Sequence, residues 1–163
     1  MAEIRELTAD DWRAWRTLRL SALAEAPQAF GARLADWRGE GDTEARWRAR
    51  LTDVPFNVLA AVAGHDAGMA SATAPDDEGV VDLLSMYVAP SARGLGVGEA
   101  LVEAVAQWAS HQDARTVRLQ VFEDNAAAIA LYRRCGFLED GTVQYRRPAL
   151  KMVRGLRHPS RSA

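Results

Sequence analysis

The sequence has few of the residues that could cross-link the chain or hold a metal ion. Among 163 residues there is one cysteine, Cys135, and the three histidines are His65, His111 and His158. A single cysteine excludes an internal disulfide framework and a thiolate-rich zinc site. The histidines are too far apart in sequence to show a metal-ligand spacing. We therefore predict a chain with no structural disulfide and no bound metal.

The sequence also has no excess of charge of one sign and no long apolar run. Lysine and arginine number 20 against 22 aspartate and glutamate residues, a formal net charge of −2. Nucleic-acid-binding proteins usually carry a basic excess or stripe. No apolar run approaches the roughly 18 residues that span a bilayer, and the first residues are charged, unlike a signal peptide. We expect a soluble, cytoplasmic protein that binds neither nucleic acid nor membrane.

The composition that remains is typical of a globular domain. Hydrophobic residues make up 48% of the chain and charged residues 26%, and the length suffices for one hydrophobic core. We find no internal repeat and no linker. We therefore predict one α+β domain, mixed in its strand directions, over residues 1–154, followed by a basic, mobile tail at residues 155–163.

Apolar periodicity divides this domain into strands and helices. We predict strands at residues 1–8, 56–63, 68–73, 80–88 and 115–122, with one or two closing strands within 143–153. Helical spacing predicts helices at residues 11–25, 43–51, 98–110 and 125–134. Residues 30–41 are predicted to form a short helix or an ordered loop.

A glycine-rich segment separates the most strongly predicted strand from a long amphipathic helix. It reads Arg93-Gly94-Leu95-Gly96-Val97-Gly98. Glycines let the main chain approach a ligand closely, and the free N–H groups at the start of a helix form an anion site. We therefore predict phosphate or pyrophosphate binding here, with an ordinary strand-to-helix turn as the alternative. A P-loop would end in Gly-Lys-Ser/Thr and a dinucleotide fingerprint would have glycine at Glu99, so neither pattern fits.

A second segment occurs further along the chain and reads Asn125-Ala126-Ala127-Ala128-Ile129-Ala130-Leu131-Tyr132-Arg133-Arg134-Cys135-Gly136-Phe137. With the Arg-x-x-Gly-x-Gly pattern before it, the chain resembles the GNAT (GCN5-related) N-acetyltransferases, including uncharacterised bacterial members. The resemblance is most specific between residues 83 and 137. It implies a curved, mixed sheet of six to seven strands flanked by about four helices. It also implies acetyl-CoA as co-substrate.

The resemblance assigns the cofactor contacts to particular residues. It implies that main-chain groups of Met86, Tyr87 and Val88 pair with the pantetheine arm, on a central strand that diverges from its neighbour after Met86. Residues 93–98 would bind the pyrophosphate, and Asn125 would hydrogen-bond the pantetheine. Asn125 is equally suited to cap the following helix.

The resemblance also implies the reaction. Acetyl would pass from acetyl-CoA to a primary amine of a small molecule or protein, by direct attack in a ternary complex. Tyr132 would protonate the departing CoA thiolate, although helical periodicity alone would make it a core aromatic.

The general base and the acceptor are left open by the sequence. Some relatives use a glutamate as base where this chain has Gln120, so Asp82, Glu123 or a water chain are the alternatives. The missing glutamate also allows a non-catalytic, acyl-CoA-binding regulatory module. No motif identifies the acceptor amine, the acyl-chain preference or the oligomeric state, for which a homodimer is one possibility.

Overall fold

The computed structural model describes residues 2–156, which form one seven-stranded sheet with four α-helices. The strands are β1 (Ala2–Glu6), β2 (Phe56–Val62), β3 (His65–Ala72), β4 (Val80–Val88), β5 (Thr116–Phe122), β6 (Leu138–Gln144) and β7 (Pro148–Gly155). The helices are α1 (Trp12–Glu25), α2 (Glu44–Asp53), α3 (Val97–His111) and α4 (Ala126–Arg134). The predicted mixed sheet with about four helices is confirmed.

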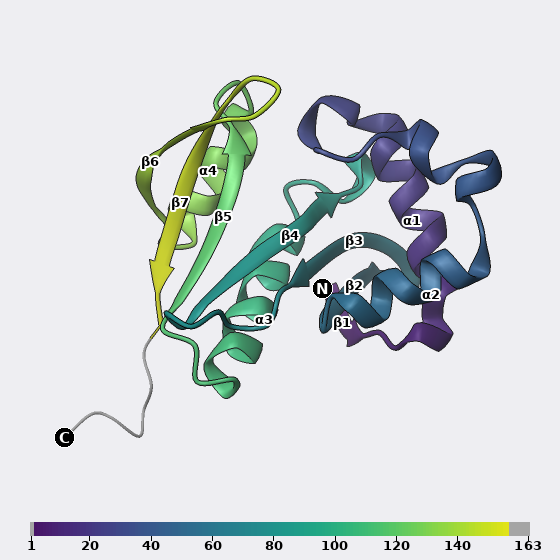
Figure 1. Cartoon of the computed structure of the whole chain (residues 1–163), viewed down its shortest axis with the longest axis horizontal. Helices are drawn as coiled ribbons and strands as arrows, with labels where there is room; N and C mark the ends of the chain where they lie inside the picture. The colour runs from purple at the N-terminus through teal and green to yellow at the C-terminus, as the bar shows by residue number, and fades with distance from the viewer. Residues whose placement is uncertain (1, 157–163) are drawn as a thin grey trace.

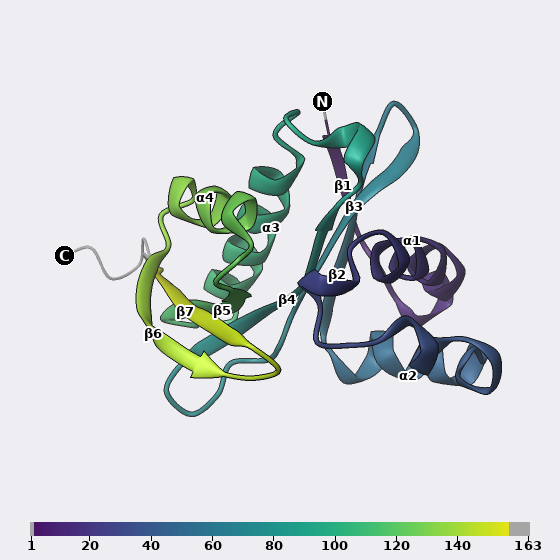
Figure 2. The same cartoon turned by 90° about the horizontal axis from the view of Figure 1, so that it is seen from above.

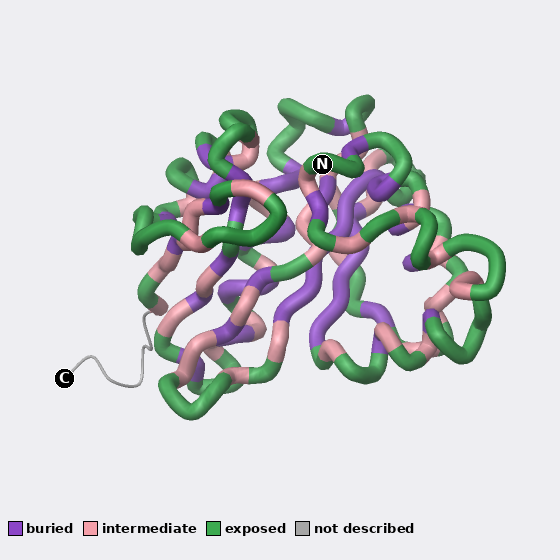
Figure 3. The backbone as a smooth tube through the Cα atoms, turned by 45° about the horizontal axis from the view of Figure 1, so that its top comes forward, coloured by how far each residue is buried: buried purple, intermediate pink, exposed green. Residues whose placement is uncertain are grey.

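The helices cover the two faces of the sheet. Figures 1 and 2 show α3 and α4 on one side of the sheet and α1 and α2 together on the other side of β1–β4. On α3 the apolar stripe that includes Leu101 and Val105 is fully buried, and on α1 the stripe that includes Trp15 and Ala22 is fully buried. Buried residues follow the strands between these helices (Figure 3). The molecule therefore has a separate hydrophobic cluster on each face.

The two halves of the sheet separate between β4 and β5. Sheet order is β1-β2-β3-β4-β5-β7-β6, and β4 and β5 form its one parallel pair within the described residues. These strands are paired only from Val80↔Thr116 to Asp82↔Arg118 and then diverge as the V visible in Figure 1. The family resemblance implied divergence after Met86, but the strands part earlier, after Asp82.

A bulge in β4 lies just beyond the point where the two strands part. The register between β3 and β4 shifts between Met69↔Tyr87 and Ser71↔Leu84, so β4 carries one extra residue. Ser85 within it has φ +55°, a left-handed conformation that is uncommon for serine. A bulge bends its strand and increases the local twist, which turns β4 away from β5.

Other boundaries differ from the predictions at the sheet edges. The closing segment consists of two strands, and β6 begins at Leu138, ahead of the predicted range. Nearly all side chains of this edge strand are exposed, so it lacks the alternation that identifies a half-buried strand. The 30–41 segment contains 3₁₀ turns at Leu34–Trp37 and Gly39–Gly41.

The chain end is described only as far as residue 156. Gly155 still pairs with Thr116, and the N–H of Leu156 donates to the carbonyl oxygen of Arg115 at 2.8 Å. Residues 157–163 of the predicted basic tail lie outside the described residues, so the domain boundary stays a prediction. Over the part of the chain seen here, no helix combines the length and apolarity required to cross a membrane.

Candidate functional site

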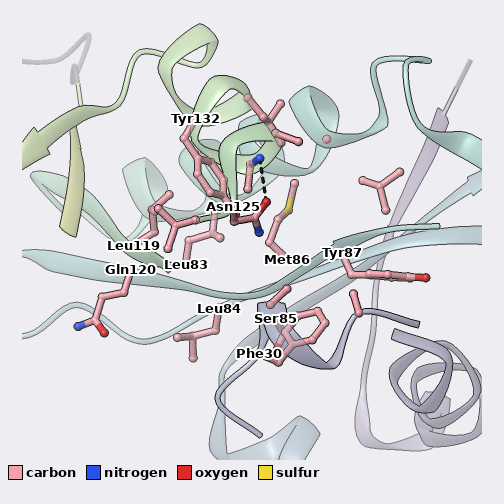
Figure 4. Close-up of a pocket in the computed structure, with 18 of the residues that line it drawn as sticks. Phe30, Leu83, Leu84, Ser85, Met86, Tyr87, Leu119, Gln120, Asn125 and Tyr132 are labelled. Carbon is pink, nitrogen blue, oxygen red and sulfur yellow. Dashed lines mark hydrogen bonds between the residues drawn. The ribbon is translucent and has the colours of Figure 1, made fainter. Parts of the chain in front are cut away.

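A cavity of about 1360 Å³ opens where β4 and β5 diverge. Its wall includes the end of α1 and the turn after it, both diverging strands, the glycine-rich loop and one side of α4. Ligand pockets commonly measure about 300–1,000 Å³, so this cavity has room for a large ligand and a second small one. Figure 4 shows Met86, Asn125 and Tyr132 on one side of the strands, and Phe30, Leu84 and Gln120 on the other.

The free edge of β4 supplies main-chain groups to this cavity. Beyond Asp82 the edge that faces β5 has no strand partner among residues 2–156, and it includes Met86, Tyr87 and Val88. The Tyr87 ring is buried and packs against Phe30 with ring centroids 6.3 Å apart. Unpaired strand edges bind extended ligands by adding them as a further strand.

The glycine-rich loop leaves its main chain open. Gly94 and Gly96 have φ of +78° and +80°. A Cβ at Gly94 would have no neighbour within 4 Å, and at Gly96 only a Glu99 carboxylate oxygen at 4.0 Å. The first hydrogen bond of α3 runs from the Ala100 N–H to the Gly96 carbonyl, so earlier amides have no helical acceptor. Such amides form an anion site.

A carboxylate of the chain itself occupies the start of α3. Glu99 accepts a hydrogen bond from its own N–H and another from Arg134 at 3.1 Å, and these bonds lower the pKa of its carboxyl. An acidic group is therefore stabilised where a phosphate is predicted to bind. The helix start fits an anionic ligand.

The remaining loop residues have different surroundings. Gly98 is buried, and a Cβ there would come within 2.8 Å of the Leu131 side chain, so this glycine also permits close contact between α3 and α4. Val97 is buried and Leu95 is 60% exposed. The Arg93 side chain pairs with Glu25 at 3.1 Å and donates to the Val88 carbonyl at 3.0 Å, which ties the loop to the end of α1.

Asn125 and Tyr132 belong to α4 and its cap. The Asn125 side chain accepts from the Ala128 N–H at 3.3 Å, which makes it the N-cap (Figure 4). Tyr132 is 6% exposed, and its ring meets Phe137 edge-on at 5.8 Å. Burial raises the pKa of the Tyr132 phenol above its usual value, so the group stays protonated. Its ring lies near the side chains of Leu83 and Leu119 (Figure 4), and among the described residues no hydrogen bond acts on its hydroxyl.

The two carboxylates considered for the general base differ in their surroundings, and Gln120 stands where some relatives have a glutamate. Asp82 is in the cavity wall, but Arg118 donates to both of its carboxylate oxygens, at 2.7 and 3.0 Å. Glu123 is exposed and lies outside the wall. Gln120 lines the cavity and points away from Tyr132 (Figure 4).

Two arginines in the wall were not predicted from the sequence. Arg19 of α1 and Arg50 of α2 reach the cavity from the side opposite α4. Arg19 follows Leu18 and stands four residues after Trp15, inside the buried stripe of α1. An arginine within an apolar stripe is the signal that could have identified it, because charged residues are rarely buried without a partner.

Similarity to known proteins extends over nearly the whole chain. Residues 3–137 match the model described as "Acetyltransferase (GNAT) family". An aminoglycoside N(6')-acetyltransferase type 1 of Stenotrophomonas maltophilia is 30% identical over 159 residues, 91% of this chain and 94% of that protein. An uncharacterised N-acetyltransferase of Bacillus subtilis is 34% identical over 69 residues, 42% of this chain and 28% of that protein.

A solved structure extends the similarity to the fold. The N-acetyltransferase of Thermoplasma acidophilum in complex with coenzyme A matches with a TM-score of 0.74 and 16% identity, over 95% of this chain and 99% of that one. At this identity the likeness shows a common fold. Curated relatives that match over short stretches are longer proteins, since the matched part is only 18–29% of their length.

Proposed function

Because the chain belongs to the acetyltransferase (GNAT) family, whose model matches residues 3–137, we propose that it is an acetyl-CoA-dependent N-acetyltransferase. It transfers acetyl to a primary amine by direct attack while both substrates are bound. The observation that carries the proposal is the unpaired edge of β4, which runs through a cavity reaching both layers of helices. The name of the relative from Stenotrophomonas maltophilia, similar over most of its length, supports an amine acceptor.

The cofactor binds on the α3–α4 side of the gap. Its pyrophosphate lies against residues 93–98, where open glycines and the first amides of α3 favour an anion. Its pantetheine arm follows the free edge of β4 past Met86, Tyr87 and Val88, toward Asn125. Binding replaces the contact of Glu99 with the helix start and leaves Arg134 near the phosphates.

The transfer step needs a hydrogen-bond donor that stabilises the negative charge on the carbonyl oxygen, and an acid that protonates the leaving thiolate. The amine nitrogen attacks the thioester carbonyl, a C–N bond forms, and the C–S bond breaks. A main-chain N–H on the free edge of β4 donates to the carbonyl oxygen as negative charge develops there. The Tyr132 hydroxyl gives a proton to the departing thiolate. The proton lost by the amine returns through water to Tyr132, so the enzyme regains its starting state.

Water, and no single carboxylate, removes the amine proton. Asp82 is held by Arg118 where β4 and β5 last pair, and Glu123 lies outside the cavity wall. A group that deprotonates the amine must come within hydrogen-bond reach of it, directly or through one water. Solvent in the open cavity meets this requirement.

The experiment is a CoA-release assay. Protein and acetyl-CoA are incubated with a panel of primary amines and a thiol-reactive probe, and products are checked by mass for one added acetyl group. We expect amine-dependent CoA release and a higher melting temperature with acetyl-CoA, which binds the native state. Stabilisation without CoA release from any amine would favour the regulatory module. A melting temperature that does not change when acetyl-CoA is added would contradict the cofactor assignment.

A further inference from the structure

Most of the charged side chains in the cavity wall form ion pairs with one another. Six arginines and four carboxylates line the cavity. Each of the four carboxylates forms an ion pair with one of the arginines: Glu25 with Arg93, Asp82 with Arg118, Glu99 with Arg134 and Asp124 with Arg147. The other two arginines, Arg19 and Arg50, form no ion pair with a carboxylate among residues 2–156. The cavity therefore carries two uncompensated positive charges.

Arg19 is the less satisfied of the two. Its residue exposure is 9%, and its Nη1 atom is buried with no hydrogen-bond partner in the described part of the chain. Its guanidinium stacks on the Phe30 ring, 4.7 Å from the centroid. Burial, with a smaller effect of Arg50, lowers the pKa of Arg19 to about 10, so the group is still charged at neutral pH. An isolated buried cation destabilises a fold, which points to a role in binding.

Arg50 is held next to it by neutral partners. It donates to Asn57 Oδ1 at 2.9 Å and to the hydroxyls of Ser71 and Ser85 at 3.1 Å each. Burial lowers the pKa of Arg50 to about 10, and Asp53 is the one carboxylate that opposes this effect. These contacts orient the guanidinium without neutralising it. Through Ser85 they also connect Arg50 to the bulge that opens β4.

Both cations lie on the acceptor side of the gap. They come from α1 and α2, whereas Asn125 and Tyr132 belong to the α4 side. Phe30, which Arg19 covers, lies across the strands from Tyr132 (Figure 4). An anion bound between these arginines would be on the far side of β4 from the proposed cofactor.

We propose that the acceptor is a primary amine that also carries a carboxylate or phosphate group, and that Arg19, with Arg50 beside it, binds this anion. Guanidinium groups bind carboxylates and phosphates through paired N–H donors. The anion would supply the charge and the hydrogen-bond acceptors that the wall lacks. This inference rests on the proposed acetyl transfer for its amine, while the anion site can be tested without turnover.

The binding experiment uses matched acetylated ligands. Protein saturated with CoA is titrated calorimetrically with N-acetylphenylalanine and with N-acetylphenylalaninamide, then with N-acetylglycine and its amide. We expect at least one acid to bind about tenfold or more tightly than its amide, since hydrogen bonds to charged groups contribute on that scale. Equal affinities within both pairs, or no binding of either acid, would exclude a carboxylate, and the proposal would then be overturned unless turnover shows a preference for the phosphate-bearing amine.

Variants of α1 identify the cation. Arg19→Gln should abolish the preference for the acid, Arg19→Lys should keep part of it, and Arg13→Gln is the matched control, since Arg13 is exposed on the same helix. Arg19→Met should raise the denaturation midpoint, because it removes an unpaired buried charge. A preference that survives in Arg19→Gln, or a lower midpoint in Arg19→Met, would overturn the proposal.

Turnover separates this inference from the proposed function. CoA release is compared for phenylalanine against phenylalaninamide and for O-phosphoethanolamine against ethanolamine. A higher kcat/KM for one of the anionic amines supports the inference, and the pair that shows it identifies carboxylate or phosphate. Faster release with both neutral amines overturns it and leaves acetyl transfer standing. If no amine releases CoA while an acid still binds through Arg19, acetyl transfer fails and the anion site remains.

Discussion

Tyr132 is a buried residue of α4, and its hydroxyl has no hydrogen-bond partner among the described residues. Tyr132→Phe keeps the ring and its contact with Phe137, so stability and acetyl-CoA affinity should change little. Turnover with the best amine should fall at least about tenfold, toward or below the low end of the roughly 10²–10⁴-fold typical of general acids, because burial makes this phenol an even weaker acid relative to a thiol. Tyr145→Phe is the control, since Tyr145 is exposed and outside the cavity wall. Equal turnover numbers at saturating acetyl-CoA would make Tyr132 a packing residue.

Asp82 tests the assignment of the proton path. Its carboxylate joins Arg118 across the last paired residues of β4 and β5, and both side chains are 34% exposed. Asp82→Asn should lower the free energy of unfolding by less than about 1 kcal/mol, as for other partly exposed ion pairs. The pH dependence of kcat/KM should keep its shape. Loss of an ionisation from that profile, with a large fall in rate, would identify Asp82 as the base.

Some residue positions could be read from the sequence and others could not. Gly94, Gly96, Asn125 and Tyr132 occur in linear motifs, and the structure brings all four to one cavity. Arg19 and Arg50 reach the same cavity from two separate helices. Their shared lack of a carboxylate depends on which charges the fold brings together, so no local pattern could reveal it.

At the scale of elements, the loop before α3 is the most sensitive segment. Gly96→Asp introduces a side chain at φ +80° and an acid beside the helix start. The left-handed conformation should cost about 1–2 kcal/mol of stability, and Gly64→Asp, at φ +82° in the β2–β3 turn, is the matched control. Only Gly96→Asp should also weaken acetyl-CoA binding, because its carboxylate repels the pyrophosphate. Calorimetry should show an affinity lower by tenfold or more. Equal affinities in the two variants would contradict the loop assignment.

The contact between α1 and α2 should determine the acid limit of stability. Asp42 accepts hydrogen bonds from Arg16 of α1 and from the Trp47 indole of α2, and these bonds lower the pKa of its carboxyl from 3.8 to about 2. A depressed carboxyl pKa stabilises the fold above the unfolded value and loses that effect as pH falls through the folded value. Urea midpoints should therefore decline between about pH 4 and 2.

Asp42→Asn should flatten that decline, whereas Asp77→Asn, in an exposed loop, should leave it intact. If the urea midpoint declines equally at low pH in wild type and in Asp42→Asn, another group causes the loss of stability in acid.

Elements differed in how well the sequence predicted them. The strand at Val80–Val88 and the helix after the glycines were predicted almost to the residue, because apolar periodicity and glycine agree there. The start of β6 was missed, since this edge strand buries almost nothing. The bulge at Ser85 was also invisible, because it arises from the shifted register between β3 and β4.

At the scale of the whole molecule, the divergence of β4 and β5 creates the proposed site. It leaves strand edges unpaired inside a cavity whose two sides belong to different helical layers. The sequence predicted a diverging central strand through family resemblance alone, and the bulge in β4 lies just beyond the point where the strands part.

The most direct test of this account is amide hydrogen exchange with and without acetyl-CoA. If the pantetheine arm pairs with the free edge of β4 and the pyrophosphate with the loop, amides in residues 83–88 and 94–99 should exchange more slowly when acetyl-CoA is bound. Amides of β1 and β2, which are far from the β4–β5 gap in the order of the sheet, should exchange at the same rate with and without acetyl-CoA. Protection confined to other segments, or exchange at residues 83–88 that acetyl-CoA does not change, would contradict the central claim.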